Sequence, residues 1–318
     1  MSAMLFDRDE VDHLDDLPDD LEGLNGSELL WVDIDRGKGD KAEEVARAFD
    51  LDEATRDHLG SSSGRAVFDD YGRYIHLTTY SPCDEDDDED LVALECVVGK
   101  NWVITAHDRP LSVLSEFAER VSGSGGTGVL DGPVFLATLL EWVLGAYSAA
   151  FERLAERLEE FDVQAMRGHR TEQDIERLVA ERQKVGVLRR ALAAHRTPLT
   201  ALTHPELDAL GSDKSGERFE SLLGRFETTV QEARDARESI VGSFDVLIAR
   251  TGHRTNDIMK VLTLASVTLL PGAVIAGVMG MNFKVGLFEV TWAFYVVIAV
   301  MAAIAILTVG AAKLRGWF

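Results

Sequence analysis

Short apolar runs separated by polar segments make up the first third of the chain. Runs of this length, bounded by turn residues, predict strands at residues 29–34, 66–68, 74–80, 91–98 and 101–106. Apolar residues at helical spacing predict helices at residues 40–49, 52–59 and 111–121. Residues 1–25 are rich in Asp and Leu without either pattern, and we expect their start to be loosely ordered. The pattern therefore indicates a small α/β domain with a mixed or largely antiparallel sheet.

Long helical patterns follow. Residues 133–195 form one helical run, and a second begins near Ser215. In the second run apolar residues recur at steps of four and three, as in a heptad repeat, at Phe219, Leu223, Phe226, Val230, Ala233, Ile240, Phe244 and Leu247. No proline follows before Pro271, so one helix from Phe219 to Met279 would be roughly 90 Å long. An ordinary bundle helix would carry the same stripe, but the length and continuity favour a stalk.

Two uncharged apolar segments lie near the C-terminus, at residues 261–279 and 290–312. Each is close to the ~20 residues needed to cross a bilayer, and their short connection predicts a helical hairpin. Basic residues flank the outer ends of this hairpin, at Arg250, His253, Arg254, Lys260, Lys313 and Arg315. Such flanks stay on the cytoplasmic side, so we expect a cell (inner) membrane protein with both termini in the cytoplasm. Residues 1–20 are acidic and lack an apolar centre, so no signal peptide is expected.

Charge divides the chain in the same way. The 318 residues carry a net charge of −23, yet residues 251–318 contain only two acidic and five basic residues. The first 250 residues therefore carry −26. Acidity of this strength argues against nucleic acid as a partner, because phosphate binding needs a basic surface. The acids either draw cations toward a pore by their summed field or only keep the domain soluble, and both interpretations stay open.

Sequence motifs of the common enzyme classes are missing. The chain has no His-Glu-x-x-His motif, no phosphate-binding loop and no nucleophile elbow, so we expect neither an enzyme nor a cofactor. A Gly-x-Gly-x-x-Gly match at Gly123, Gly125 and Gly128 follows a predicted helix instead of a strand, and is interpreted as a loop. Cys83 and Cys96 form no metal-binding pair and are expected to be reduced.

Two further features invite a metal-site interpretation. Residues 84–90 are seven consecutive acids, which form either a cation site or, more commonly, a solvated loop. His253 is the histidine nearest the apolar segments, but it fits a helix surface better than a metal ligand.

The first apolar segment differs from a simple anchor, because it carries hydroxyl and small residues at Thr263, Ser266, Thr268, Gly272 and Gly277. Such residues suit close helix contacts or a wetted face. One hairpin cannot surround a pore, however, so conduction would require several copies around an axis.

The residues between the two apolar segments carry a family resemblance. Gly280-Met281-Asn282-Phe283 closes the first segment after a long helix, and in this position it resembles the signature of the CorA family of divalent metal cation transporters. Residues 256–263 resemble the start of that family's first span, and residues 94–107 and 31–33 resemble stretches of its soluble domain. The similarity extends from about residue 28 onward.

The resemblance implies an α+β fold and a funnel-shaped homopentamer in the lipid bilayer. It divides the chain into a cytoplasmic α/β domain at residues 1–130, a helical stalk at 131–258 and a transmembrane hairpin at 259–318. The first span of each subunit lines the pore. The family motif implies a metal selectivity ring of Gly280, Met281 and Asn282, and pore-facing positions at Asn256, Met259, Leu262, Leu270 and Ala273.

The chemistry of these residues fits Mg²⁺, with Co²⁺ or Ni²⁺ as related cargo. Mg²⁺ dehydrates reluctantly, and a ring of Asn282 amide oxygens accepts hydrogen bonds from its waters. Rings of Met259, Leu262 and Leu270 would form an apolar constriction that gates by dewetting.

Departures from the family pattern leave the ion open. Met279 stands where an aromatic residue is common and Ala273 where a hydroxyl residue is common. Lys284 and Glu289 lie in a loop that is more acidic in magnesium members. A zinc transporter similar to ZntB is therefore one alternative, although Zn²⁺ prefers nitrogen and sulfur ligands. A non-conducting, membrane-anchored sensor or scaffold is another, and it would have no transport to lose on Asn282→Ala.

Overall fold

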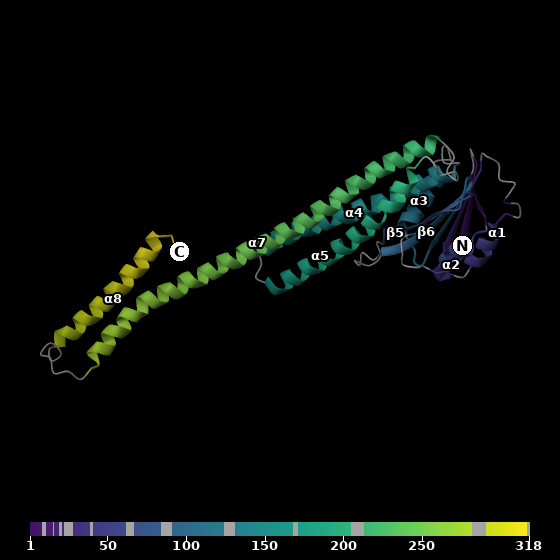
Figure 1. Cartoon of the computed structure of the whole chain (residues 1–318). Coiled ribbons are helices and arrows are strands. Elements are labelled where there is room, and N and C mark those ends of the chain that lie inside the picture. Colours follow the sequence, from purple (N-terminus) through teal and green to yellow (C-terminus); the bar gives the residue numbers. More distant parts are fainter. Residues whose placement is uncertain are drawn as a thin grey trace. The chain divides into compact units, whose positions relative to one another are not determined.

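The computed structural model describes residues 1–7, 11–14, 16–18, 21, 28–38, 41–61, 67–83, 91–123, 131–167, 171–204, 213–281 and 291–316. It divides into two compact units, Met1–Ser243 and Phe244–Phe318. The helix α7 (Asp213–Met279) contributes to both (Figure 1).

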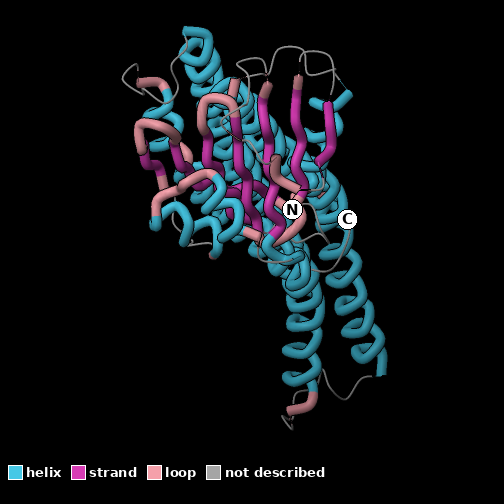
Figure 2. Tube along the Cα trace, turned by 90° about the vertical axis from the view of Figure 1, so that its right-hand side faces the viewer, coloured by secondary structure: helices cyan, strands magenta, loops and turns pink. Residues whose placement is uncertain are grey.

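A seven-stranded sheet in the order β2-β1-β3-β7-β6-β5-β4 forms the centre of the first unit. Its strands are β1 Ser2–Phe6, β2 Val11–Leu14, β3 Leu29–Asp35, β4 Phe68–Asp70, β5 Ile75–Pro82, β6 Leu91–Val98 and β7 Trp102–His107. β3 and β7 pair in parallel and the other neighbours pair antiparallel. Figure 2 shows the strands side by side with helices packed against them. The prediction of a mixed, largely antiparallel sheet is confirmed.

The N-terminal residues were expected to be loosely ordered, and this expectation is wrong for the part of residues 1–25 that the structure describes. β1 pairs with both β2 and β3. Ala3 and Phe6 are buried, and the Phe6 ring lies 6.1 Å from that of Phe135. A five-residue strand is too short to show a clear period, and it is stabilised by its neighbours in the sheet.

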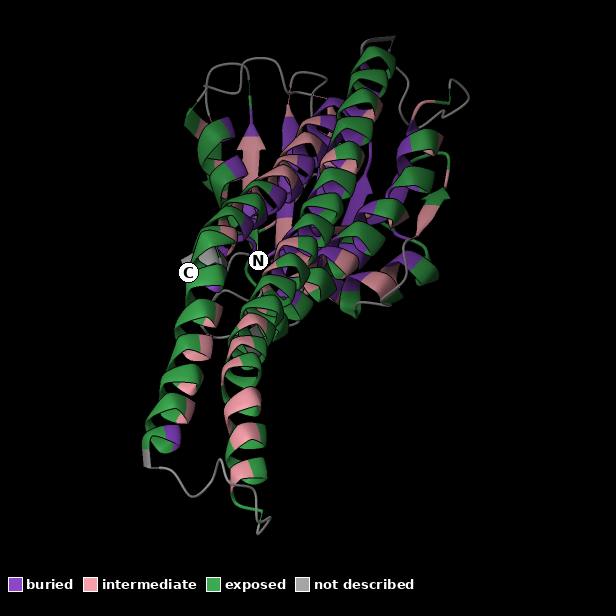
Figure 3. Ribbon diagram, turned by 90° about the vertical axis from the view of Figure 1, so that its left-hand side faces the viewer, coloured by how far each residue is buried: buried purple, intermediate pink, exposed green. Residues whose placement is uncertain are grey.

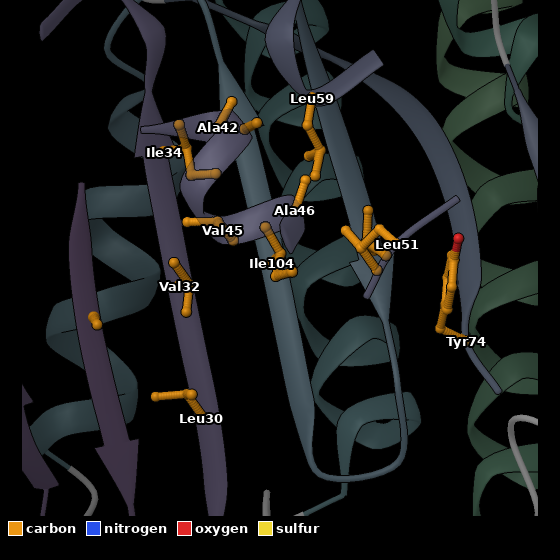
Figure 4. Packing of buried hydrophobic residues seen from close by; sticks show 13 residues of the cluster. Leu30, Val32, Ile34, Ala42, Val45, Ala46, Leu51, Leu59, Tyr74 and Ile104 are labelled. Atoms are coloured by element: carbon orange, nitrogen blue, oxygen red, sulfur yellow. The ribbon is translucent and has the colours of Figure 1, made fainter. Parts of the chain in front are cut away.

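One face of the sheet is covered by α1 (Ala42–Ala48) and α2 (Glu53–Gly60). Figure 4 shows Val32 and Ile34 of β3 and Ile104 of β7 beneath Val45 of α1 and Leu59 of α2. All of these side chains are buried, because alternate residues of a strand point to the same face.

The opposite face is covered by α3 (Ser112–Gly123) and α4 (Gly132–Arg167). Trp31 of β3 packs against Phe117 of α3 and Phe135 of α4, with ring centroids 5.7 and 5.2 Å away. Its indole N–H donates to Thr105 Oγ1 at 3.0 Å, so this large side chain is buried with its polar atom satisfied. Two further helices complete this layer, α5 (Thr171–Ala194) and α6 (Arg196–Leu202).

A strict heptad of buried positions runs along α7 within the first unit. The buried residues recur at alternating steps of four and three, at Ser215, Phe219, Leu222, Phe226, Thr229, Ala233, Ala236, Ile240 and Ser243. The predicted stripe shared Phe219, Phe226, Ala233 and Ile240 but was wrong at Leu223 and Val230, which are half-buried. The apolar pattern was misleading because polar residues occupy some of the buried positions of this heptad. Thr229, for example, donates to the Arg225 carbonyl oxygen and lies 3.4 Å from Ser148 Oγ of α4.

The second unit consists of the C-terminal part of α7 and α8 (Thr291–Leu314), which form a hairpin. Pro271 lies within α7 without ending the helix. Figure 3 shows the surface of this hairpin almost entirely as exposed or intermediate residues, in contrast to the sheet.

Candidate ion pathway

Three helices in the described part of the chain are long and apolar enough to cross a membrane, judged by length and composition: Gly132–Gln164, Ser215–Met279 and Trp292–Leu314. The apolar window of the first is 61% buried inside the protein, as expected for a helix in a soluble core. The windows of the other two are 0% and 6% buried. These two helices therefore carry apolar surface that the single chain leaves uncovered.

One face of α7 packs against α8. The half-buried residues of α7 in this region include Leu264, Thr268, Gly272, Ile275 and Met279, at helical steps of three and four. Thr268 Oγ1 lies 3.2 Å from Thr308 Oγ1 of α8. A Cβ on Gly272 would lie 3.2 Å from Met301 Cε of α8, so a side chain there would require Met301 to shift.

The predicted pore-facing residues lie on the other side of α7. Asn256, Met259, Leu262, Leu270 and Ala273 are all exposed. At 100° per residue they fall within an arc of about 120° that is centred opposite the α8-contacting face. The structure therefore brings these five residues to one face, and α8 leaves that face free.

The same face ends in the first part of the predicted selectivity ring. The Gly280 N–H donates to the Ala276 carbonyl oxygen at 2.9 Å, and the Met281 N–H donates to Val278 at 3.2 Å, which closes the last turn. Gly280 and Met281 are exposed. Asn282 lies outside the described residues, as do the loop residues Lys284 and Glu289.

The cytoplasmic flank proposed from the sequence also lies on exposed helix surface. His253 and Arg254 are exposed, and Lys260 forms an ion pair with Asp257 at 2.8 Å, one turn earlier. The acidic run at residues 84–90 lies outside the described residues. Of the Gly-x-Gly-x-x-Gly match, Gly123 ends α3, and the other two glycines are also outside the described part.

A possible metal-ligating cluster that sequence reasoning missed lies in the α/β domain. His58, His76 and Glu95 each offer a ligand atom within 4.8 Å of the others, and among the described residues no other group of this kind is found. The three residues are 18 and 19 positions apart and belong to no short motif. The only indication in the sequence is that His76 and Glu95 are polar residues within apolar strands.

Comparison with known families places almost the whole chain. Residues 26–312 match the model of the family described as CorA-like Mg²⁺ transporter protein. A cobalt/magnesium transport protein CorA from Methanocaldococcus jannaschii is 20% identical over 292 residues, which cover 91% of each chain. The divalent cation transporter CmaX from Pseudomonas aeruginosa is 23% identical over 280 residues, covering 86% of this chain and 80% of that one.

Solved structures agree with this placement. The complete M. jannaschii CorA structure matches with a TM-score of 0.82 at 19% identity, over 100% of this chain and 99% of that one. Full-length CmaX matches with a TM-score of 0.75 at 19% identity, over 100% and 98% of the two chains. The cytoplasmic domain of ZntB from Vibrio parahaemolyticus matches with a TM-score of 0.63 at 12% identity, over 80% and 98%. The expected fold class, an α/β domain followed by long helices and two apolar C-terminal helices, is confirmed.

Proposed function

Since the chain belongs to the family of CorA-like Mg²⁺ transporter proteins, we propose that it carries Mg²⁺ across the membrane through a homopentameric pore lined by α7. The family is one of divalent-cation transporters, and its members are not enzymes. The observation that carries the proposal is the uncovered face of α7, which bears Asn256, Met259, Leu262, Leu270 and Ala273 opposite the α8 contact.

This face needs partners beyond a single chain. It is exposed and apolar, and one hairpin cannot enclose an aqueous path. Five copies arranged around an axis, with α7 inside and α8 outside, would cover it. The two outer ends of the hairpin, rich in Lys and Arg, would then lie in the cytoplasm together with the α/β domain and the helical stalk.

The residues along the pore would act in sequence. The Gly280-Met281-Asn282 ring at the outer mouth would hold a hydrated ion through Asn282 amide oxygens, because Mg²⁺ keeps its inner waters. Rings of Leu270, Leu262 and Met259 would form the apolar constriction, and a ring of Asn256 amides would receive the ion at the cytoplasmic end.

Zn²⁺ transport within the same fold is the second candidate. Lys284 would place a positive charge near the outer mouth, where magnesium transport benefits from acids, and the cytoplasmic fold is similar to that of ZntB. The described pore face, however, carries no His or Cys, which Zn²⁺ prefers. We therefore place Mg²⁺ first.

Uptake into liposomes containing the purified protein tests both candidates. We expect Mg²⁺ entry that Asn282→Ala abolishes and that Ile306→Ala leaves intact, because Ile306 lies on the face of α8 turned away from α7. Entry of Zn²⁺ alone would replace the magnesium proposal with the zinc one. No entry of either ion, over a range of internal metal concentration and pH, would favour a non-conducting scaffold.

A further inference from the structure

The side chains of His58, His76 and Glu95 converge between α2 and the sheet. Thr78 of β5 lies directly opposite Glu95 of β6, so His76, two residues before Thr78, shares a sheet face with Glu95. His58 lies in the last turn of α2, which covers this face. The His58 and His76 rings are 5.2 Å apart in an edge-to-face arrangement. Three separate elements thus supply two imidazoles and a carboxylate to one point.

The Glu95 carboxylate is 0% exposed, yet it makes few hydrogen bonds for a buried charged group. Its Oε2 accepts a hydrogen bond from Thr78 Oγ1 at 2.7 Å and lies 3.1 Å from His76 Nε2. Its Oε1 accepts no hydrogen bond from the described part of the chain, and His58 Nδ1 is likewise buried without a partner there. Leaving a buried carboxylate oxygen unpaired is costly, so two unused ligand atoms in one cluster need an explanation.

The backbone that carries His58 is held in place independently. Arg36 Nη2 donates to the His58 carbonyl oxygen at 2.7 Å, and Arg36 Nε donates to that of Leu59 at 2.8 Å. The same guanidinium pairs with Asp108 at 2.9 Å. His58 therefore faces the two strand residues from a fixed helix end, as preorganised metal sites require.

We propose that His58, His76 and Glu95 bind one borderline divalent metal ion of the Zn²⁺, Co²⁺ or Ni²⁺ class within the α/β domain. Two imidazole nitrogens and one carboxylate oxygen are the ligand set of many three-residue zinc sites, with a water in the fourth position. Tetrahedral ligands at zinc distances lie about 3.3–3.6 Å apart, so small side-chain rotations close the cluster around an ion. Mg²⁺, which prefers oxygen ligands in octahedral geometry, fits this set poorly.

The ion would link α2 to β5 and β6, and His58, which is half-buried, would be the side from which it enters. This site is chemically different from the pore, whose proposed ligands are the side-chain amide oxygens of asparagine. It therefore stands or falls independently of the transport proposal, and it would let the α/β domain bind a transition metal while Mg²⁺ is in large excess.

Titration of the full-length protein in detergent, after removal of metal with a chelator, tests the proposal. We expect a Zn²⁺ site in the wild type that persists in excess Mg²⁺, and at least about 100-fold weaker binding in His58→Ala and Glu95→Gln, since even supporting residues of metal sites contribute 10–100-fold. Co²⁺ should give the visible absorption of a four- or five-coordinate site, and His58→Ala should remove it. His204→Ala, which changes an exposed histidine just beyond the end of α6, should behave like the wild type.

X-ray absorption of the wild type loaded with one equivalent of Zn²⁺ needs no variant. It should show nitrogen and oxygen ligands at about 2.0–2.2 Å with imidazole scattering from two histidines. Absence of saturable Zn²⁺ binding in the wild type, unchanged binding in a folded His58→Ala, or a zinc spectrum without imidazole would overturn the proposal and leave the cluster as a hydrogen-bonded His76–Glu95 pair.

Discussion

His107 and Asp33 form an ion pair between the adjacent parallel strands β7 and β3, with His107 Nε2 3.2 Å from Asp33 Oδ2. The other ring nitrogen, Nδ1, lies 2.7 Å from the Arg109 carbonyl oxygen. Both neighbours offer oxygen acceptors, so this geometry favours the doubly protonated, charged form of the His107 ring. Burial opposes this charge, but the hydrogen bond and the charge of Asp33 outweigh it, and together they raise the pKa of His107 above 6.5.

The raised pKa predicts how stability depends on pH. The contribution of His107 is fully present below pH 6.5 and is lost as the pH rises through its folded-state pKa. Asp33→Asn should therefore cost about 1.5–3 kcal/mol near pH 6, the value of a hydrogen bond to a charged group, and less near pH 9. Thermal unfolding at the two pH values measures this difference. Asp69→Asn, on the exposed edge strand β4, is the control. An equal cost at both pH values would show that His107 is neutral.

His195 should have the opposite dependence. Its Nε2 accepts hydrogen bonds from Thr79 Oγ1 at 2.5 Å and from the Tyr80 N–H at 3.0 Å, so this nitrogen has no proton. Complete burial lowers its pKa to about 4. Stability linked to His195 is present above pH 6.5 and is lost as the pH falls toward 4, by on the order of 3 kcal/mol.

His195→Gln tests this dependence, because glutamine can accept the same hydrogen bonds but does not titrate. The thermal midpoint of the wild type should fall more steeply between pH 7 and pH 4.5 than that of the variant. If the thermal midpoints of the two proteins fall equally between pH 7 and pH 4.5, His195 does not cause the loss of stability in acid.

Gly132, the first residue of α4, should not tolerate a side chain. A Cβ there would collide with the carbonyl oxygen of Gly99. The Gly132 N–H also donates to the Lys100 carbonyl oxygen at 2.8 Å, so the two backbone segments are held together and cannot easily move apart. We expect Gly132→Ala to lower the free energy of unfolding by about 1–3 kcal/mol, the usual cost of overpacking. Gly145→Ala, in the same helix with open space around it, should be neutral or stabilising by up to about 1 kcal/mol. Chemical denaturation of both variants measures the contrast.

Predictions from the sequence were accurate for features set by neighbouring residues and less accurate for features set by contacts between distant residues. The strands at residues 91–98 and 101–106 and the long helix ending at Met279 were predictable. The spacing of their apolar residues and the turn residues at their ends can both be read from neighbouring positions in the sequence. The stripe of buried residues along α7 was predicted one position too late, at Leu223 and Val230, where Leu222 and Thr229 are buried. Thr229 is polar, and its burial is explained by its hydrogen bonds to Arg225 and Ser148, which the sequence does not show.

Contacts between distant residues were not predictable. Glu95 and His58 are brought together by a strand pairing and by a helix packed over it, and nothing near either residue in the sequence indicates the other. The predicted pore-facing residues were named through a family motif instead. Helical spacing alone could not choose between the α8-contacting face and the uncovered face of α7, since both have the same period.

The hairpin helices α7 and α8 approach each other closely at Gly272. Because a Cβ there already lies 3.2 Å from Met301 Cε, Gly272→Leu should force the two helices apart and lower the thermal midpoint of the detergent-solubilised protein. Gly310→Leu adds the same side chain to α8 where nothing lies within 4 Å, and should leave the midpoint unchanged. Equal effects of the two substitutions would mean that detergent contact, and not helix packing, limits stability.

The proposed apolar constriction should be sensitive to polarity at Leu270. If a ring of leucines excludes water from the closed pore, Leu270→Ser should wet it and increase Mg²⁺ leak into liposomes under conditions in which the wild type is closed. Ile306→Ser is the matched control, because both side chains are exposed in the single chain, at 66% for Leu270 and 72% for Ile306, but on opposite sides of the hairpin. A leak of wild-type size in Leu270→Ser, or an equal increase in both variants, would remove Leu270 from the constriction and require another ring on the same face to form the barrier.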